Sequence, residues 1–157
     1  MNKGVALAFD CCCNRSCRSI LYGTRNNRLE LQGDILKVRS HEIDDANTVA
    51  VLDFRLTNPS TQQFVVKEVE VFVDDTSADI FPEIDAQRLF QYYPDLGQKY
   101  NSSLIRRDKI DPGAQVDRMI AIRVGGKDES FQRRKRLRLV VQDADGAKRE
   151  IVKLHAE

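Results

Sequence analysis

The chain has 157 residues, of which 41% are hydrophobic and 31% are charged. These values are typical of one soluble globular domain that buries its core without a disulfide or metal staple, and they exclude a disordered or collagen-like chain. Lysine and arginine total 25 and aspartate and glutamate total 24, so a net charge of +1 gives no overall attraction to nucleic acid. We therefore expect no nucleic-acid partner.

The first 27 residues contain all four cysteines and lack the regular pattern of the rest of the chain. Their apolar run, residues 5–9, is shorter than the roughly 7–15 residues of a secretory signal, and an acylation site would need small residues where Phe9 and Asp10 precede Cys11. The CCCxxxC spacing is not the paired arrangement that zinc favours. We interpret residues 1–27 as a flexible leader or a degenerate anchor, and residues 28–157 as the folded domain.

Regular alternation begins at residue 29. Residues 29–38 predict a first strand with a bulge or kink at Gly33, and the polar residues 40–47 predict a loop. Residues 49–57 alternate most clearly and lead into an Asn-Pro-Ser turn. One side of this segment carries Ala50, Leu52, Phe54 and Leu56, and the other carries Val49, Val51, Asp53, Arg55 and Thr57. The pattern predicts a strand with one core face and one solvent-exposed face.

A valine-rich strand is predicted over residues 65–73, and the period of the pattern then changes. Asp85 is placed as the N-cap of a helix over residues 86–93, with Ile84 and Leu89 spaced as a hydrophobic staple and Pro94 ending the helix. So short a helix is stable only when it leans on the sheet or covers one end of the core.

The rest of the chain again favours strands. A weaker strand is predicted over residues 103–110, and clearer ones follow a Pro-Gly turn at residues 116–124, 136–141 and 149–154. The polar residues 127–135 connect two of them, with a helical turn around residues 129–133 as one option. The predicted class is all-β: an immunoglobulin-like antiparallel β-sandwich of about seven strands with one short helical insertion.

Two segments carry a family resemblance. The strand and turn LDFRLTNPS, followed by a valine-rich strand, and the later segment DPGAQVDRMIAIRV resemble bacterial immunoglobulin-like envelope domains. They are also distantly similar to the water-stress domain of type 2 late-embryogenesis-abundant proteins. The resemblance extends over residues 29–154 and implies a noncatalytic module, often secreted or membrane-tethered, with no catalytic residue to carry over.

The expected function is therefore a noncatalytic binding or accessory module at the bacterial cell envelope, with a stress-protective or structural sandwich as the alternative. A periplasmic or membrane-tethered location is favoured over a cytoplasmic one, and contact with a membrane would occur only through the leader. We expect a protein partner and a monomer or weak dimer.

Catalytic and metal chemistry find little support in the residue pattern. The two histidines, His41 in a predicted loop and His155 in the tail, lie in no recognisable catalytic motif, so we predict no enzyme, no cofactor and no catalytic residue. Asp143, Asp145 and Gly146 imitate part of a calcium loop but are more simply a hairpin turn. No metal site is predicted.

Loops on an antiparallel sandwich alternate between its two ends, which selects a candidate binding face. The end that holds residues 40–47, 74–101 and 125–135 gathers the aromatic helix and a basic run. Aromatic and arginine side chains are enriched at interface hot spots, and binding residues concentrate on long loops. The predicted partner-binding residues are Phe90, Tyr92, Tyr93, Arg133, Arg134 and Arg136. The alternative is that the helix plugs the open end of the core and that the basic run is a solvated loop and strand edge.

Overall fold

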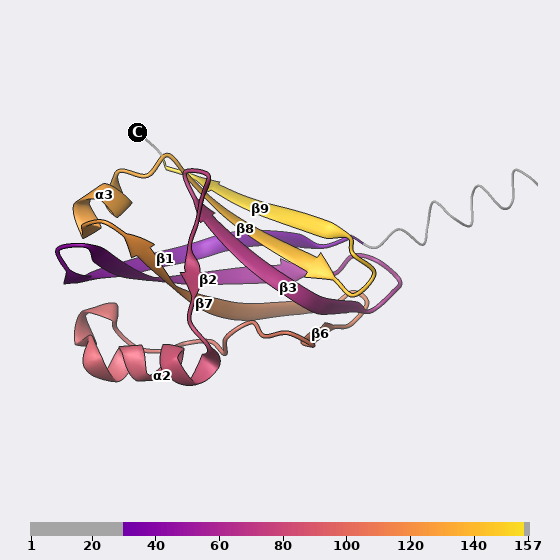
Figure 1. The fold of residues 1–157 in the computed structure, drawn as a ribbon. Helices are drawn as coiled ribbons and strands as arrows, with labels where there is room; N and C mark the ends of the chain where they lie inside the picture. The colour runs from indigo at the N-terminus through magenta and orange to yellow at the C-terminus, as the bar shows by residue number, and fades with distance from the viewer. Residues whose placement is uncertain (1–29, 156–157) are drawn as a thin grey trace, which may run out of the picture.

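The computed structural model describes residues 30–155 and consists of two antiparallel sheets packed face to face (Figure 1). The first sheet has the order β1 (Gln32–Asp44), β2 (Asn47–Thr57), β7 (Gln115–Gly125) and β5 (Asp79–Ile80). The second has the order β4 (Thr76–Ser77), β3 (Phe64–Val73), β8 (Arg136–Asp143) and β9 (Lys148–Leu154), and β6 (Lys109–Ile110) pairs with β3. The predicted boundary at residue 27 lies outside the described residues.

The strand order confirms the predicted all-β sandwich. In constant-type immunoglobulin domains, strands A, B, E and D form one sheet and strands C, F and G form the other. The order β1-β2-β7-β5 opposite β3-β8-β9 is the same arrangement, with β4 as a short additional edge strand on β3.

The main core lies between the two sheets, where the predicted core side of β2 meets the inner side of β8. Phe54 and Leu52 of β2 are fully buried there, together with Leu139 of β8. Burial of apolar side chains of this size contributes about 1.5–3 kcal/mol each, so this layer is the principal source of stability.

The Asn-Pro-Ser turn is held by a buried amide. The side chain of Asn58 donates hydrogen bonds to the carbonyl oxygens of Gln62 (2.7 Å) and Ile110 (2.9 Å), and its Oδ1 accepts one from Ser60 Oγ (2.6 Å). Asn58 is fully buried, so every one of these polar atoms depends on its partner. The turn is thus hydrogen-bonded to β6. It lies at the end of the sandwich opposite the β1–β2 turn, as the alternation of loops between the two ends predicted.

The polar segment predicted as a loop is instead the second half of β1. β1 pairs with β2 as far as Asp44, and only Asp45 and Ala46 form the turn between them. Polar side chains in this half of β1 make hydrogen bonds on both faces of the sheet. Ser40 Oγ accepts one from Gln132 on one face, and Arg39 donates one to the carbonyl of Leu96 on the other. A strand covered by polar contacts on both faces carries no apolar alternation, which is why the pattern failed here.

The irregularity in β1 is also displaced from its predicted position. The register of β1 against β2 shifts at Leu36 and again at Ile43, each of which is an extra residue, and not at Gly33. Gly33 instead permits close packing between the sheets, because a Cβ at this position would lie 2.3 Å from Cδ1 of Ile151.

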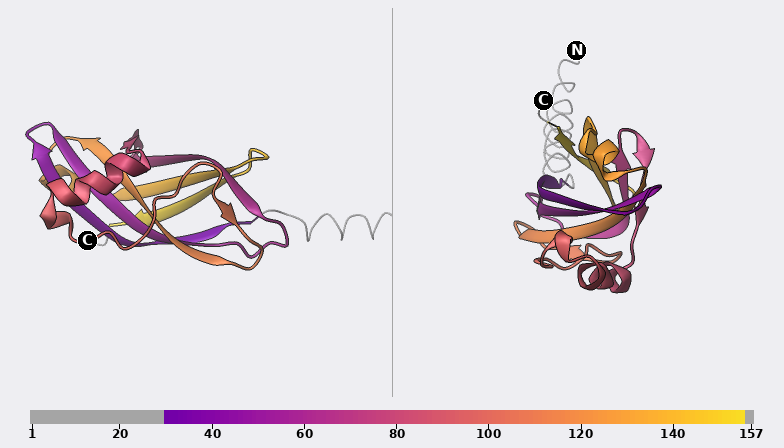
Figure 2. Two further views of the ribbon diagram at one scale, coloured as in Figure 1. Left: turned by 90° about the horizontal axis from the view of Figure 1, so that it is seen from below. Right: turned by 90° about the vertical axis from the view of Figure 1, so that its left-hand side faces the viewer.

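The outer face of the first sheet is buried, which corrects the prediction of a solvent-exposed face. Residues 81–103, which we call the cover segment, run across this face and contain α2 (Glu83–Tyr92) and the 3-10 helix η1 (Pro94–Leu96) (Figure 2). Val49 and Val51 pack against Ala86, Leu89 and Leu96 in a second apolar cluster. On the predicted exposed side only Arg55 and Thr57 are partly exposed; Val49, Val51 and Asp53 are buried.

The helix begins earlier than predicted. Pro82 is the N-cap, α2 starts at Glu83, and Asp85 is its third residue. Ile84 is 62% exposed, so it does not staple onto Leu89. A helix this short was expected either to pack on the sheet or to cover one end of the core. α2 packs on the outer face of the first sheet and does not cover an end of the core.

The last differences are small. Of the weak strand predicted at residues 103–110, only β6 pairs over two residues, with an isolated bridge between Ser103 and Met119. The optional helical turn is present as α3 (Asp128–Gln132), whose Phe131 closes one end of the main core.

Candidate functional site

The predicted aromatic residues lie on the outside of the first sheet, in and after α2. Phe90 and Tyr93 are half-buried against the second apolar cluster, while Tyr92 is 73% exposed. The Tyr93 ring lies 4.8 Å from the ring of His41, centre to centre. Two of the three aromatic side chains therefore contribute to packing of the cover segment.

The predicted basic residues lie around the junction of α3 and β8. Arg134 is buried, with Nη1 donating to the carbonyl of Phe131 (3.0 Å) and the guanidinium 4.4 Å from that ring's centre. Burial lowers the pKa of Arg134, and the charges of Asp74 and Asp128 oppose this change. Arg136 pairs with Asp75, and Arg133 is exposed.

These two groups do not form one surface. The β1–β2 hairpin lies between α2 and α3, with α2 on its outer side and α3 toward the second sheet (Figures 1 and 2). α2 and α3 both lie near the end where this hairpin turns, as the loop parity predicted, but on opposite sides of the first sheet.

A buried ion pair fixes the middle of the cover segment. Arg39 of β1 donates to Asp53 of β2 (2.7 Å), and the two side chains are only 9% and 6% exposed. The same guanidinium donates to the carbonyls of Leu96 (2.6 Å) and Gln98 (2.7 Å). Asp53 also accepts a hydrogen bond from Asn101 (3.2 Å), so the pair joins two strands and the segment above them.

A second polar contact joins the beginning of the cover segment to its end. Glu83, at the start of α2, accepts hydrogen bonds from Lys99 Nζ (2.6 Å) and from the main-chain nitrogen of Ser103 (3.1 Å). Burial alone would raise the pKa of Glu83, but the hydrogen bond and charge of Lys99 and the hydrogen bonding from Ser103 outweigh it and hold the pKa below the ordinary value of 4.5.

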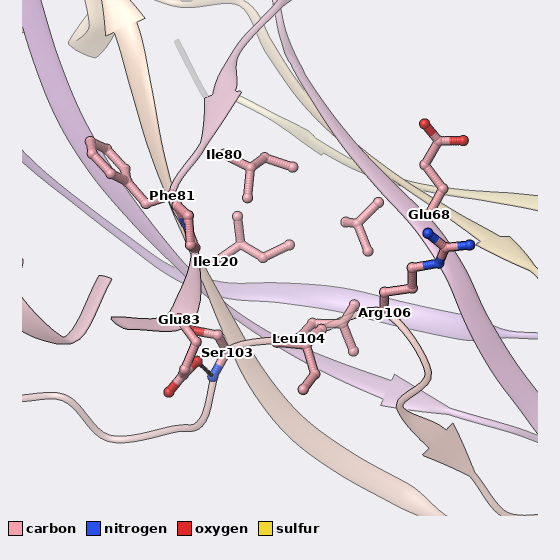
Figure 3. Close-up of a pocket in the computed structure, with 11 residues that line it drawn as sticks. Glu68, Ile80, Phe81, Glu83, Ser103, Leu104, Arg106 and Ile120 are labelled. Carbon is pink, nitrogen blue, oxygen red and sulfur yellow. Dashed lines mark hydrogen bonds between the residues drawn. The ribbon is translucent and has the colours of Figure 1, made fainter. Parts of the chain in front are cut away.

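Beside this contact a pocket of about 280 Å³ opens between β3 and the cover segment, and we call it the side pocket (Figure 3). Its lining is mostly apolar and comes from two strands of the first sheet, from β3 and from the loop before β6. The apolar lining residues are Val69, Ile80, Phe81, Pro82, Leu104, Ile105 and Ile120. Ile80 and Ile105 are 37% and 49% exposed, so the apolar surface continues to the mouth.

The side pocket also contains polar groups with free bonding capacity. Ser103 is 8% exposed, and its Oγ is buried without a hydrogen-bond partner. Glu68 and Arg106 lie at the mouth on the same side of the pocket, and neither belongs to an ion pair within residues 30–155 (Figure 3). Because Ser103 Oγ has almost no accessible surface, the charged side chains of Glu68 and Arg106 are the polar groups at the mouth that a ligand can reach.

Comparisons with family models, curated proteins and solved structures returned no match.

Residues 30–155 contain no helix with the length and apolar character needed to cross a membrane. They also contain no group of three or more His, Cys, Asp or Glu side chains arranged to hold a metal ion.

The sequence reasoning missed the side pocket. Its one available signal is the pair Leu104-Ile105, followed by two arginines, within a segment treated as a weak strand. Two adjacent apolar residues cannot both face the core of a half-buried strand, so one of them had to lie toward solvent. The structure assigns that place to Ile105, while Leu104 is buried.

Proposed function

We propose that the chain is a noncatalytic immunoglobulin-like module that binds a protein partner through the surface around the side pocket. The observation that carries this proposal is the pocket itself: an apolar hollow with exposed isoleucines and two exposed charged side chains, Glu68 and Arg106, at its mouth. Concave apolar sites with a few polar groups are the usual form of binding sites.

The surrounding surface supports a macromolecular partner. Ile80, Ile84 and Ile105 are exposed around the start of the cover segment, and a second hollow lined by Ile80 and Asp85 adjoins the side pocket. Apolar side chains grouped in this way on a rigid sandwich mark interaction surfaces more often than isolated ones do. The resemblance to bacterial envelope domains supports a location at the cell envelope.

Site-specific cross-linking tests this function. A photoreactive amino acid at position 105 should cross-link to one partner in cells of the source organism. The matched control is position 36, because Leu36 is also an exposed apolar residue (45%) but lies on β1, at the opposite edge of the first sheet from β5.

Equal cross-linking at positions 36 and 105, or none at 105, would contradict the proposal. Protection of a labile enzyme during drying, without a cross-linked partner, would instead support the stress-protective alternative. Fractionation of the same cells would test the envelope location, since a partner and a module that are both cytoplasmic would exclude it.

A further inference from the structure

The second edge of β3 is paired at both ends and open in the middle. β6 pairs with the start of β3, and β4 pairs with its end. Two further hydrogen bonds extend this pairing inward: Arg107 N donates to Val66 O (2.7 Å), and Ala78 N donates to Val71 O (2.9 Å). Between them, within residues 30–155, β3 has a partner strand only on the other side, in β8.

The open part of the edge coincides with the side pocket. Because main-chain groups alternate between the two edges of a strand, those of Val69 face the same edge as those of Val71. Val69 also lines the pocket. The register of β3 against β8 shifts at Lys67, so the regular part of this edge runs from Glu68 to Val71. At a rise of about 3.3 Å per residue its three steps span roughly 10 Å, which leaves the main-chain groups of Val69 open to a partner strand.

We propose that this gap accepts an extended peptide segment of a partner protein, which pairs with β3 at Val69 and inserts one apolar side chain into the side pocket. The inference rests on the proposed function and names its mode of binding. Addition of a strand to a free sheet edge, with a pocket for alternate side chains, is a common way for proteins to bind peptides.

The pocket's size and polar groups define the peptide. Its volume of about 280 Å³ exceeds the roughly 150 Å³ of a dry cavity that holds benzene, so it has room for a leucine or phenylalanine side chain. Glu68 and Arg106 favour a segment that carries one basic and one acidic residue beside the apolar one.

Synthetic heptapeptides with blocked ends test the inference on the full-length, ¹⁵N-labelled chain. The probes TETLTKT and TKTLTET have the same composition and opposite charge order, so each controls for non-specific attraction of the other. One of them should bind in preference, with amide shifts centred on Val69, Ser103 and Ile105. The probe of the preferred order with aspartate in place of the central leucine should not bind.

Methylation of main-chain nitrogens in the preferred peptide separates strand pairing from insertion of a side chain alone. Methylation at alternate positions should weaken binding by roughly two- to tenfold per lost hydrogen bond, and methylation at the intervening positions should have no effect. Ile105→Asp should weaken binding, while Leu36→Asp should not, and the amide spectra of both variants report whether they are folded.

Three results would overturn the inference: equal binding of N-acetyl-leucinamide and the heptapeptide, insensitivity to methylation at every position, or no binding of either charge order. The last result combined with a partner cross-linked at position 105 would mean that the partner docks by a folded surface, so only the peptide mode would fail. Absence of both peptide binding and cross-linking would also reject the proposed function.

Discussion

Two arginine–aspartate pairs of equal length in the first sheet allow a direct test of burial. Arg39–Asp53 and Arg55–Asp117 both have N···O distances of 2.7 Å and both join neighbouring strands. The side chains of the first pair are almost completely buried, whereas those of the second are 43% and 38% exposed. The pairs therefore differ in their access to water and in the further hydrogen bonds that Arg39 and Asp53 make to the cover segment.

Asp53→Ala should cost about 3–5 kcal/mol in free energy of unfolding, because it leaves the Arg39 guanidinium buried without a counter-charge. That is a large part of the roughly 5–15 kcal/mol that stabilises a typical domain. Asp117→Ala should cost much less, since water solvates the remaining Arg55 and exposed ion pairs contribute little. Urea unfolding followed by far-UV circular dichroism measures both losses.

A double variant separates the loss of attraction from the cost of the orphaned charge. Arg39→Met combined with Asp53→Leu removes both buried charges and should recover much of the stability lost in Asp53→Ala. Equal losses in Asp53→Ala and Asp117→Ala would refute the argument from burial. A double variant less stable than the single one would show that the hydrogen bonds of Arg39 to Leu96 and Gln98 dominate.

Three further predictions concern the core, the turn and pH. Phe54→Ala should destabilise the chain by about 3–5 kcal/mol in urea unfolding, since the ring is fully buried, and a loss below about 1 kcal/mol would contradict this. Asn58→Asp should lower the melting temperature even at neutral pH, because a carboxylate cannot donate to the carbonyl of Ile110; an unchanged melting temperature would count against the role of this amide. Because the pKa of Glu83 is lowered in the folded chain, its share of stability is present at neutral pH and is lost as the pH falls below about 4.5. Glu83→Gln should accordingly lose less free energy of unfolding than the parent between about pH 6 and pH 3. Parallel plots of the free energy of unfolding against pH for the two proteins would exclude a contribution from this carboxylate.

The strands could be predicted wherever one face meets the core and the other meets water. Phe54 and Leu52 are buried between the sheets as their alternation required, and the loop parity placed the turns at the correct ends. The pattern failed where contacts are made on both faces. Val49 and Val51 stand opposite the core residues, and the near-continuous apolar run from 49 to 52 was the signal that both faces of β2 are covered.

The candidate site could not be predicted because it depends on tertiary contacts that leave no local pattern. Ser103 and Ile105 come near Val69 only because the cover segment crosses the sheet and returns to it. Likewise, Arg39 is an ordinary polar strand residue in the sequence, and its partners Leu96 and Gln98 are more than 50 residues away. Alternation of apolar and polar residues describes one strand at a time, so it cannot predict contacts between residues that are far apart in the sequence.

The position of the cover segment in the chain has a consequence for folding kinetics. β1–β2 and β8–β9 are hairpins with short turns and close quickly, whereas the pairing of β2 with β7 closes a loop that starts at Thr57 and ends at Gln115 and contains the whole cover segment. Such non-local pairings slow folding, because the entropy of loop closure is lost before the contacts form. Until the segment docks, Val49, Val51 and Met119 present an apolar sheet face to solvent, and refolding yield should therefore fall as the protein concentration rises.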